Sequence, residues 1–95
     1  MIANEIYELP ILEILFLNNN KLKEIDAEKI VKMKHLTTLN LQNNDIGRIA
    51  PELGKATQLK SLQLEGNAFR IPTQQVLAKG TVYLLEYLRD KLAES

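Results

Sequence analysis

Leucine and other apolar residues recur at fixed intervals in three stretches of this chain. Residues 12–22 (LEILFLNNNKL), 36–46 (LTTLNLQNNDI) and 59–69 (LKSLQLEGNAF) share the pattern L-x-x-L-x-L-x-x-N-x-apolar. The stretches start 24 and 23 residues apart, a spacing typical of repeats that stack side by side. The pattern therefore predicts one structural unit that is repeated along the chain.

Within each repeat, apolar and polar residues alternate as in a β-strand with one buried face. The side chains that this alternation directs inward are Leu15, Leu17, Leu39, Leu41, Leu62 and Leu64. One repeat cannot bury such a face alone, so neighbouring repeats place their strands side by side in a parallel sheet. We expect an α/β solenoid, a short right-handed horseshoe with the sheet on its concave face and short helices or 3₁₀ turns on its convex face.

An asparagine closes the strand segment of each repeat, namely Asn20, Asn44 and Asn67. A side-chain amide can donate to and accept from backbone groups that a turn leaves unpaired. We interpret these residues as a structural asparagine ladder. An exposed polar row with a binding role is the alternative.

The segments that lead from the end of one strand back to the start of the next, which we call return legs, carry helix signals of different strength. Residues 26–35 begin with Asp26 as an N-cap, have an acid in the first turn and lysines in the last, and so predict a short helix. In residues 50–56, Pro51 suits a first helical position and Gly54 weakens a long helix. This leg predicts a single turn or a 3₁₀ helix.

The repeat pattern stops at Pro72, and two helices are expected beyond it. Residues 73–79 predict a short helix closed by Gly80, and Thr81 is a candidate N-cap for a second helix over 82–92. The second helix carries one apolar stripe, formed by Leu84, Leu85, Leu88 and Leu92. Tyr83 and Tyr87 flank this stripe, either as a half-buried rim or as a partner-binding patch.

We divide the chain into a partial repeat (1–11), three repeats (12–35, 36–58 and 59–72) and a C-terminal helical cap (73–95) within a single domain. The segment Ile6–Leu12 resembles the second half of a repeat without its strand. We therefore expect the chain to be the C-terminal part of a longer array. The open strand edge near Leu12 also permits self-association.

Five segments carry a resemblance to known proteins, namely residues 36–45, 51–54, 66–72, 79–81 and 85–90, and the closing ones from residue 66 onward are more particular than the repeat pattern itself. Together they resemble the leucine-rich repeat family, in particular an intracellular group that includes the Ras-pathway scaffold type of repeat. Ala68 stands where this group usually has proline. The resemblance implies a non-enzymatic intracellular repeat protein, with protein binding as its usual function.

Amino-acid composition indicates the cellular location of the protein and the class of its partner. Twelve basic and twelve acidic residues give no net charge, which disfavours nucleic acid and membrane surfaces as partners. The chain has no cysteine, and its first ten residues lack the basic and apolar segments of a signal peptide. We expect a cytoplasmic protein, with the nucleus as an alternative.

Residues suited to catalysis or metal binding are sparse. His35 is the single histidine, which with the lack of cysteine argues against a zinc site. The glycines are scattered, and no phosphate-binding loop is formed. Ser61 has no histidine nearby in the repeat pattern, and the acids near Asp26 lie among lysines. We expect no catalytic residue, cofactor or metal.

Function is then expected on the outward positions of the strands. These candidate partner-binding residues are Ile14, Phe16, Asn18, Thr38, Asn40, Gln42, Ser61, Gln63 and Glu65. Uncharged polar groups around the apolar Phe16 favour a protein partner over DNA or RNA. In one alternative, Ile14 and Phe16 contact an upstream repeat and the chain is a purely structural closing segment. In another, the lysines of residues 21–34 contact RNA or acidic lipid.

Overall fold

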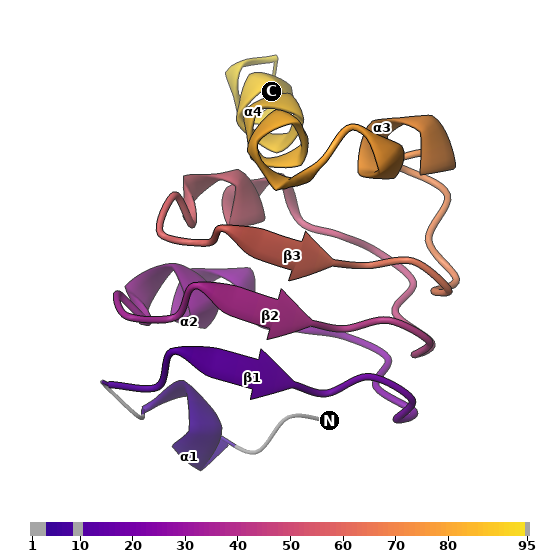
Figure 1. Cartoon of the computed structure of the whole chain (residues 1–95). Helices are drawn as coiled ribbons and strands as arrows, with labels where there is room; N and C mark the ends of the chain where they lie inside the picture. The colour runs from indigo at the N-terminus through magenta and orange to yellow at the C-terminus, as the bar shows by residue number, and fades with distance from the viewer. Residues whose placement is uncertain (1–3, 9–10, 95) are drawn as a thin grey trace.

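The computed structural model describes residues 4–8 and 11–94. Residues 1–3, 9 and 10 of the predicted partial repeat, and Ser95, lie outside the described residues. Within the described residues, the strands β1 (Ile14–Phe16), β2 (Thr38–Asn40) and β3 (Ser61–Gln63) form one parallel sheet in the order β1-β2-β3. Successive repeats thus lie side by side, and the chain is an α/β repeat fold (Figure 1).

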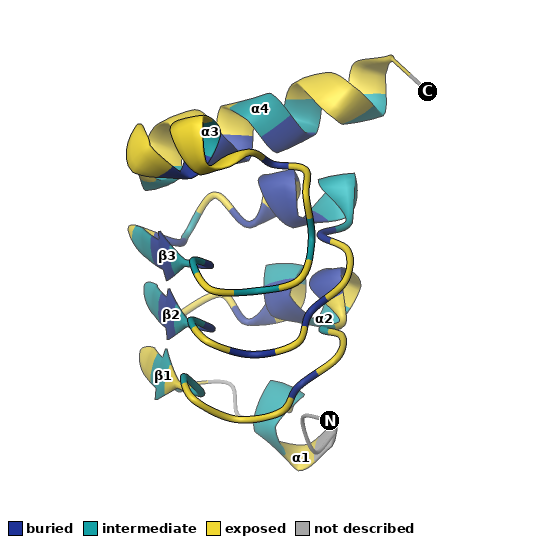
Figure 2. Ribbon diagram, turned by 90° about the vertical axis from the view of Figure 1, so that its right-hand side faces the viewer, coloured by how far each residue is buried: buried dark blue, intermediate teal, exposed yellow. Residues whose placement is uncertain are grey.

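The return legs form the second layer, behind the sheet (Figure 2). Helix α2 (Ala27–Lys32) has Asp26 as its N-cap, whose carboxylate accepts from Lys29 N–H at 3.2 Å. The next leg is the 3₁₀ helix η1 (Pro51–Lys55). Both predictions are confirmed, because capping and proline signals act within one turn. Before β1, the short helix α1 (Asn4–Tyr7) was not predicted.

The core lies between the sheet and the return legs. Its strand residues include Leu39, Leu41 and Leu64, which have no exposed surface. The corresponding Leu15 and Leu17 of the first repeat are only half-buried. The inward direction that the alternation predicts is therefore correct, but burial is complete only where a repeat has a neighbour on both sides.

Two helices follow the last strand, as predicted. Helix α3 (Gln74–Ala78) begins after Thr73, whose hydroxyl accepts from Val76 N–H, and helix α4 (Thr81–Ala93) packs mainly against η1. The stripe of α4 buries Leu84, Leu85 and Leu88 and half-buries Leu92. The predicted N-cap Thr81 is wrong. Gly80 takes the cap position, because the Thr81 hydroxyl accepts instead from Leu62 N–H of β3 at 2.9 Å.

Candidate functional site: the outer sheet face

We call the face of the sheet that is turned away from the return legs the outer sheet face (Figure 2). The strand register aligns Ile14, Thr38 and Ser61 in one row, and Phe16, Asn40 and Gln63 in the other. Equivalent positions of parallel strands project to the same side. The structure thus brings six of the nine candidate binding residues together on one surface.

This surface changes in chemistry from β1 to β3. Ile14 and Phe16 on β1 expose 55% and 64% of their surface, large fractions for apolar side chains. Both rows then continue with uncharged polar side chains that are partly exposed. No hydrogen bond joins the side chains of Thr38, Ser61 and Gln63 to another described residue, so their polar groups are available to a partner.

Three of the nine candidates, one of them on the outer sheet face, use their polar groups within the chain. Asn40 Oδ1 accepts from Gln42 N–H at 3.0 Å. Gln42 Nε2 donates to Glu65 Oε1 at 3.3 Å, and the same oxygen accepts from Leu64 N–H at 3.1 Å. These residues brace the ends of β2 and β3, which makes them poorer contacts for a partner than Gln63.

A second polar row lies one residue further along each repeat, as the repeat pattern predicts. Asn19, Asn43 and Gly66 all have a positive φ, at 61°, 58° and 79°. Asn43 Nδ2 also donates to Asn19 Oδ1 at 3.0 Å. Asparagine and glycine adopt this left-handed conformation most readily, so their recurrence at one repeat position is the sequence signal of a left-handed turn residue.

The three ladder asparagines have unequal surroundings. Asn44 is buried, and its Oδ1 accepts from Leu22 N–H of the preceding repeat at 3.1 Å. Asn67 Oδ1 accepts in the same way from Ile46 N–H at 3.1 Å. Asn20 is exposed and donates only within its own loop, to Leu17 O and Asn18 O.

The family model for the leucine rich repeat matches residues 10–69, which include all three strands and η1. The chain belongs to the leucine-rich repeat family. Leucine-rich repeats generally mediate protein–protein interactions and are typically non-enzymatic.

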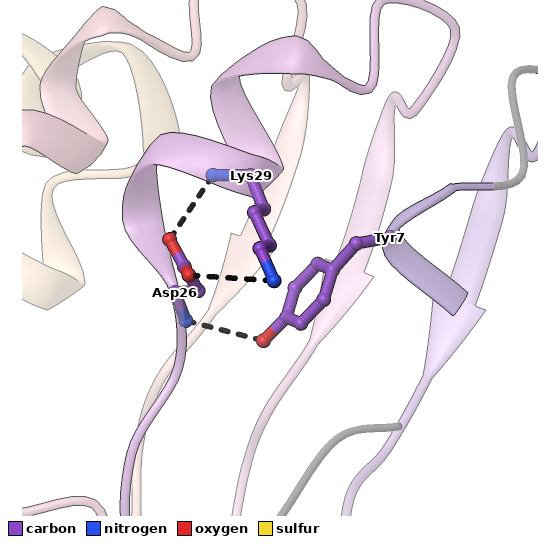
Figure 3. A network of polar contacts seen from close by, with 3 residues as sticks. All are labelled: Tyr7, Asp26 and Lys29. Atoms are coloured by element: carbon purple, nitrogen blue, oxygen red, sulfur yellow. Dashed lines mark hydrogen bonds and ion pairs between the residues drawn. The ribbon is translucent and has the colours of Figure 1, made fainter. Parts of the chain in front are cut away.

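A polar network joins α1 to the start of α2 (Figure 3). Asp26 N–H donates to the Tyr7 hydroxyl at 3.1 Å, and Lys29 Nζ lies 5.5 Å from the centre of the Tyr7 ring. Lys29 Nζ is also 4.0 Å from Asp26 Oδ2. Burial raises the pKa of Tyr7, and the hydrogen bond from Asp26 partly opposes this shift. The network holds α1 against α2.

The remaining candidates from the sequence are dispersed or already engaged. Of the lysines within residues 21–34, Lys29 contacts Tyr7 and Asp26, while Lys21 and Lys23 lie in the loop after β1. Tyr83 is 42% exposed under Lys79 Nζ, which lies 4.6 Å from its ring centre. Tyr87 is half-buried against the core. These residues form no second surface comparable to the outer sheet face.

Neither a metal site nor a membrane span is found in the described part of this leucine-rich repeat chain. Over residues 4–8 and 11–94, no three histidine, aspartate or glutamate side chains are grouped so that they could hold a metal ion. None of the helices there is both long and apolar enough to cross a bilayer.

Proposed function

We propose that this leucine-rich repeat chain is a non-enzymatic interaction module that binds a protein partner on the outer sheet face, the concave face of the solenoid. The exposure of Ile14 and Phe16 beside available polar groups is the observation that supports this function. Apolar anchors surrounded by uncharged hydrogen-bonding groups are typical of protein interfaces, whereas nucleic acid would require arginine and lysine there.

The chemistry of the face also orients the partner. Strands in a sheet lie about 4.8 Å apart, so the side chains of β1 and β3 are separated by roughly 10 Å. A partner segment that crosses the strands would place an apolar side chain over Phe16 and a hydrogen-bonding side chain near Gln63. The acidic Glu65 at the end of β3 would favour a donor or a basic group at that end.

Two double substitutions test this function. The Phe16→Ala/Gln63→Arg variant changes one exposed and one partly exposed position, whose side chains form no hydrogen bond with a described residue. The matched control, Thr57→Arg/Gln75→Arg, changes two exposed positions away from the sheet. Each protein is used as bait in lysate, and captured partners are then purified and titrated against all three chains by calorimetry. We expect the first variant alone to lose binding; equal affinity for all three chains would refute the proposal.

A purely structural role, as the closing segment of a longer repeat array, is the second candidate. It is supported by the outer edge of β3, where Leu62 N–H donates to Thr81 and Leu64 N–H donates to Glu65. Helices α3 and α4 would then be the C-terminal cap. If no purified partner binds the chain, and removal of residues 73–95 unfolds it or makes it aggregate, this second function is favoured.

The cellular setting is part of the same proposal. We infer from the closing residues 66–72, 79–81 and 85–90 a resemblance to the C-terminus of leucine-rich repeat-containing protein 40. This similarity supports an intracellular, cytoplasmic location. Fluorescence microscopy of the tagged chain tests it against a nuclear location.

A further inference from the structure

Helix α4 lies in the last layer of the stack, and no other described element covers its outer side (Figure 2). The buried leucines of α4 point into the stack. Residues spaced three and four positions apart share one side of a helix, and such a set is exposed on the side opposite those leucines. We call this set the outward face of α4; it consists of Val82, Tyr83, Glu86 and Asp90.

The outward face of α4 begins with apolar side chains. Val82 exposes 72% of its surface and Tyr83 exposes 42%. The helix that ends a repeat array normally presents a polar outer side, so adjoining valine and tyrosine side chains at this place favour contact with another protein surface. A groove between α3 and α4 adjoins them; it is lined by Gln75, Val76, Ala78, Lys79 and Tyr83.

Opposite charges lie at the two ends of this face. Lys79 Nζ lies 4.6 Å from the centre of the Tyr83 ring, which places its positive charge at the start of α4. Glu86 and Asp90 follow about one and two helical turns after Tyr83. None of the three charged side chains forms an ion pair with another described residue. Along α4, the order of the surface is therefore basic, apolar and acidic.

A surface with this order is complementary to itself under a two-fold rotation, because each patch then meets its opposite on the other copy. Two α4 helices can pack antiparallel about an axis level with the midpoint between Tyr83 and Glu86. Tyr83 of each copy then faces Glu86 of the other. The Lys79 ammonium group, which lies on the Tyr83 ring, comes next to the same glutamate. Asp90, one turn further along, lies over the groove of the other copy.

We propose that the outward face of α4 binds the same face of a second copy of this chain, in an antiparallel two-fold dimer. Val82 and Tyr83 are covered in this dimer, and Lys79 of each copy pairs with the acids of the other. The formal net charge of the chain is zero, so no long-range repulsion opposes the association. The thirteen residues of α4 give a contact about 20 Å long, a small interface that is typical of reversible dimers.

Other occupants fit this face less well. Nucleic acid and anionic lipid call for several basic groups, whereas here the charge of Lys79 is accompanied by two acids of α4. A different protein would have to present an apolar side chain and two acids at the same helical spacing. A second copy of α4 provides this pattern.

Charge reversal on both sides of the predicted ion pair tests the proposal by analytical ultracentrifugation. Lys79→Glu and Glu86→Lys should each raise the Kd of the dimer at least about ten-fold, because the two-fold axis introduces two like-charge contacts for every substitution. In an equimolar mixture of the two variants, opposite charges face each other again in the mixed dimer. The mixture should therefore dimerise with a Kd within about five-fold of the parent value.

Lys34→Glu and Asp45→Lys are the matched control pair, since both residues are exposed and lie outside α4. Each control variant should dimerise with a Kd within about two-fold of the parent value. Val82→Ser tests the apolar part of the face and should also weaken the dimer. Circular dichroism of each variant, at a concentration at which the parent is monomeric, verifies that the fold is unchanged.

Three results would overturn the proposal. The first is a parent chain that stays monomeric up to about 1 mM. The second is a dimer whose Kd is unchanged by Lys79→Glu and Glu86→Lys, which would place the contact elsewhere, for example at the open edge of β1. The third is a mixture of these two variants that dimerises no better than either alone. The proposal does not depend on partner binding at the outer sheet face, because all of these measurements use this chain alone.

Discussion

Replacement of Gly54 by alanine perturbs the closest approach between η1 and α4. A Cβ atom at Gly54 would lie 2.6 Å from Arg89 N and 2.7 Å from Leu85 O, both backbone atoms of α4. Gly54 O also accepts from Arg89 Nη1 at 2.6 Å. Because the obstructing atoms belong to a helix backbone, a side-chain rotation cannot relieve the clash, and α4 must move away from η1.

The expected loss of stability follows from the leucine side chains that α4 buries. A shift of the helix loosens the packing of Leu84, Leu85 and Leu88, which are 1–4% exposed. Overpacking of this kind costs about 1–3 kcal/mol. The smaller conformational freedom of alanine in the unfolded chain offsets about 0.4–1 kcal/mol of that. We therefore expect Gly54→Ala to lower the free energy of unfolding by about 1–2 kcal/mol, and Tm by roughly 4–8 °C for each kcal/mol.

Urea denaturation followed by circular dichroism at about 222 nm measures the effect through the helical signal. Gly47→Ala is the matched control, since no atom lies within 4 Å of a Cβ there and its φ is not in the left-handed region. The control should be unchanged or more stable by about 0.4–1 kcal/mol. If Gly54→Ala is as stable as Gly47→Ala, the close packing of α4 on η1 is refuted.

Three more predictions address the ladder, the turns and α1. Asn44→Ala should lower the free energy of unfolding, measured by urea denaturation, by about 1–3 kcal/mol. The reason is that Leu22 N–H loses its acceptor, while Leu17 O and Leu41 O keep other donors. A loss below about 0.5 kcal/mol would contradict the ladder. Gly66→Ala should lower Tm, because φ there is 79° and the new Cβ meets the Asn43 side chain; Asn43→Gly in the same chain should restore part of the loss, and no loss in the single variant would count against this geometry. Burial raises the pKa of Tyr7 above its usual 10.0. The neutral Tyr7 side chain therefore stabilises the folded chain below pH 10.0, and this stabilisation is lost as the pH rises through the raised pKa. Ultraviolet titration of the parent and Tyr7→Phe chains checks this, and a Tyr7 pKa at or below 10.0 would contradict it.

Elements whose signals are local could be predicted from the amino-acid sequence alone. The alternating leucines specify the inward face of each strand, and the capping of α2 by Asp26 acts within four residues. The same holds for Pro51 at the start of η1 and Thr73 before α3. In each case the residues that decide the conformation and the residues that adopt it are neighbours in the chain, so the pattern suffices.

Helix caps and side-chain hydrogen bonds that involve residues distant in the chain are established only by the tertiary structure. Thr81 has the chemistry of an N-cap, yet its hydroxyl bonds to Leu62, nineteen residues away, and Gly80 takes the cap position. The helix α1 is held by Tyr7 through Asp26, which is equally distant. The three ladder asparagines look alike in the sequence, but among the described residues only Asn44 and Asn67 accept from the preceding repeat, whereas Asn20 donates within its own loop. The physical reason is that a polar side chain can satisfy more than one kind of partner, and only the packed chain determines which partner lies within reach.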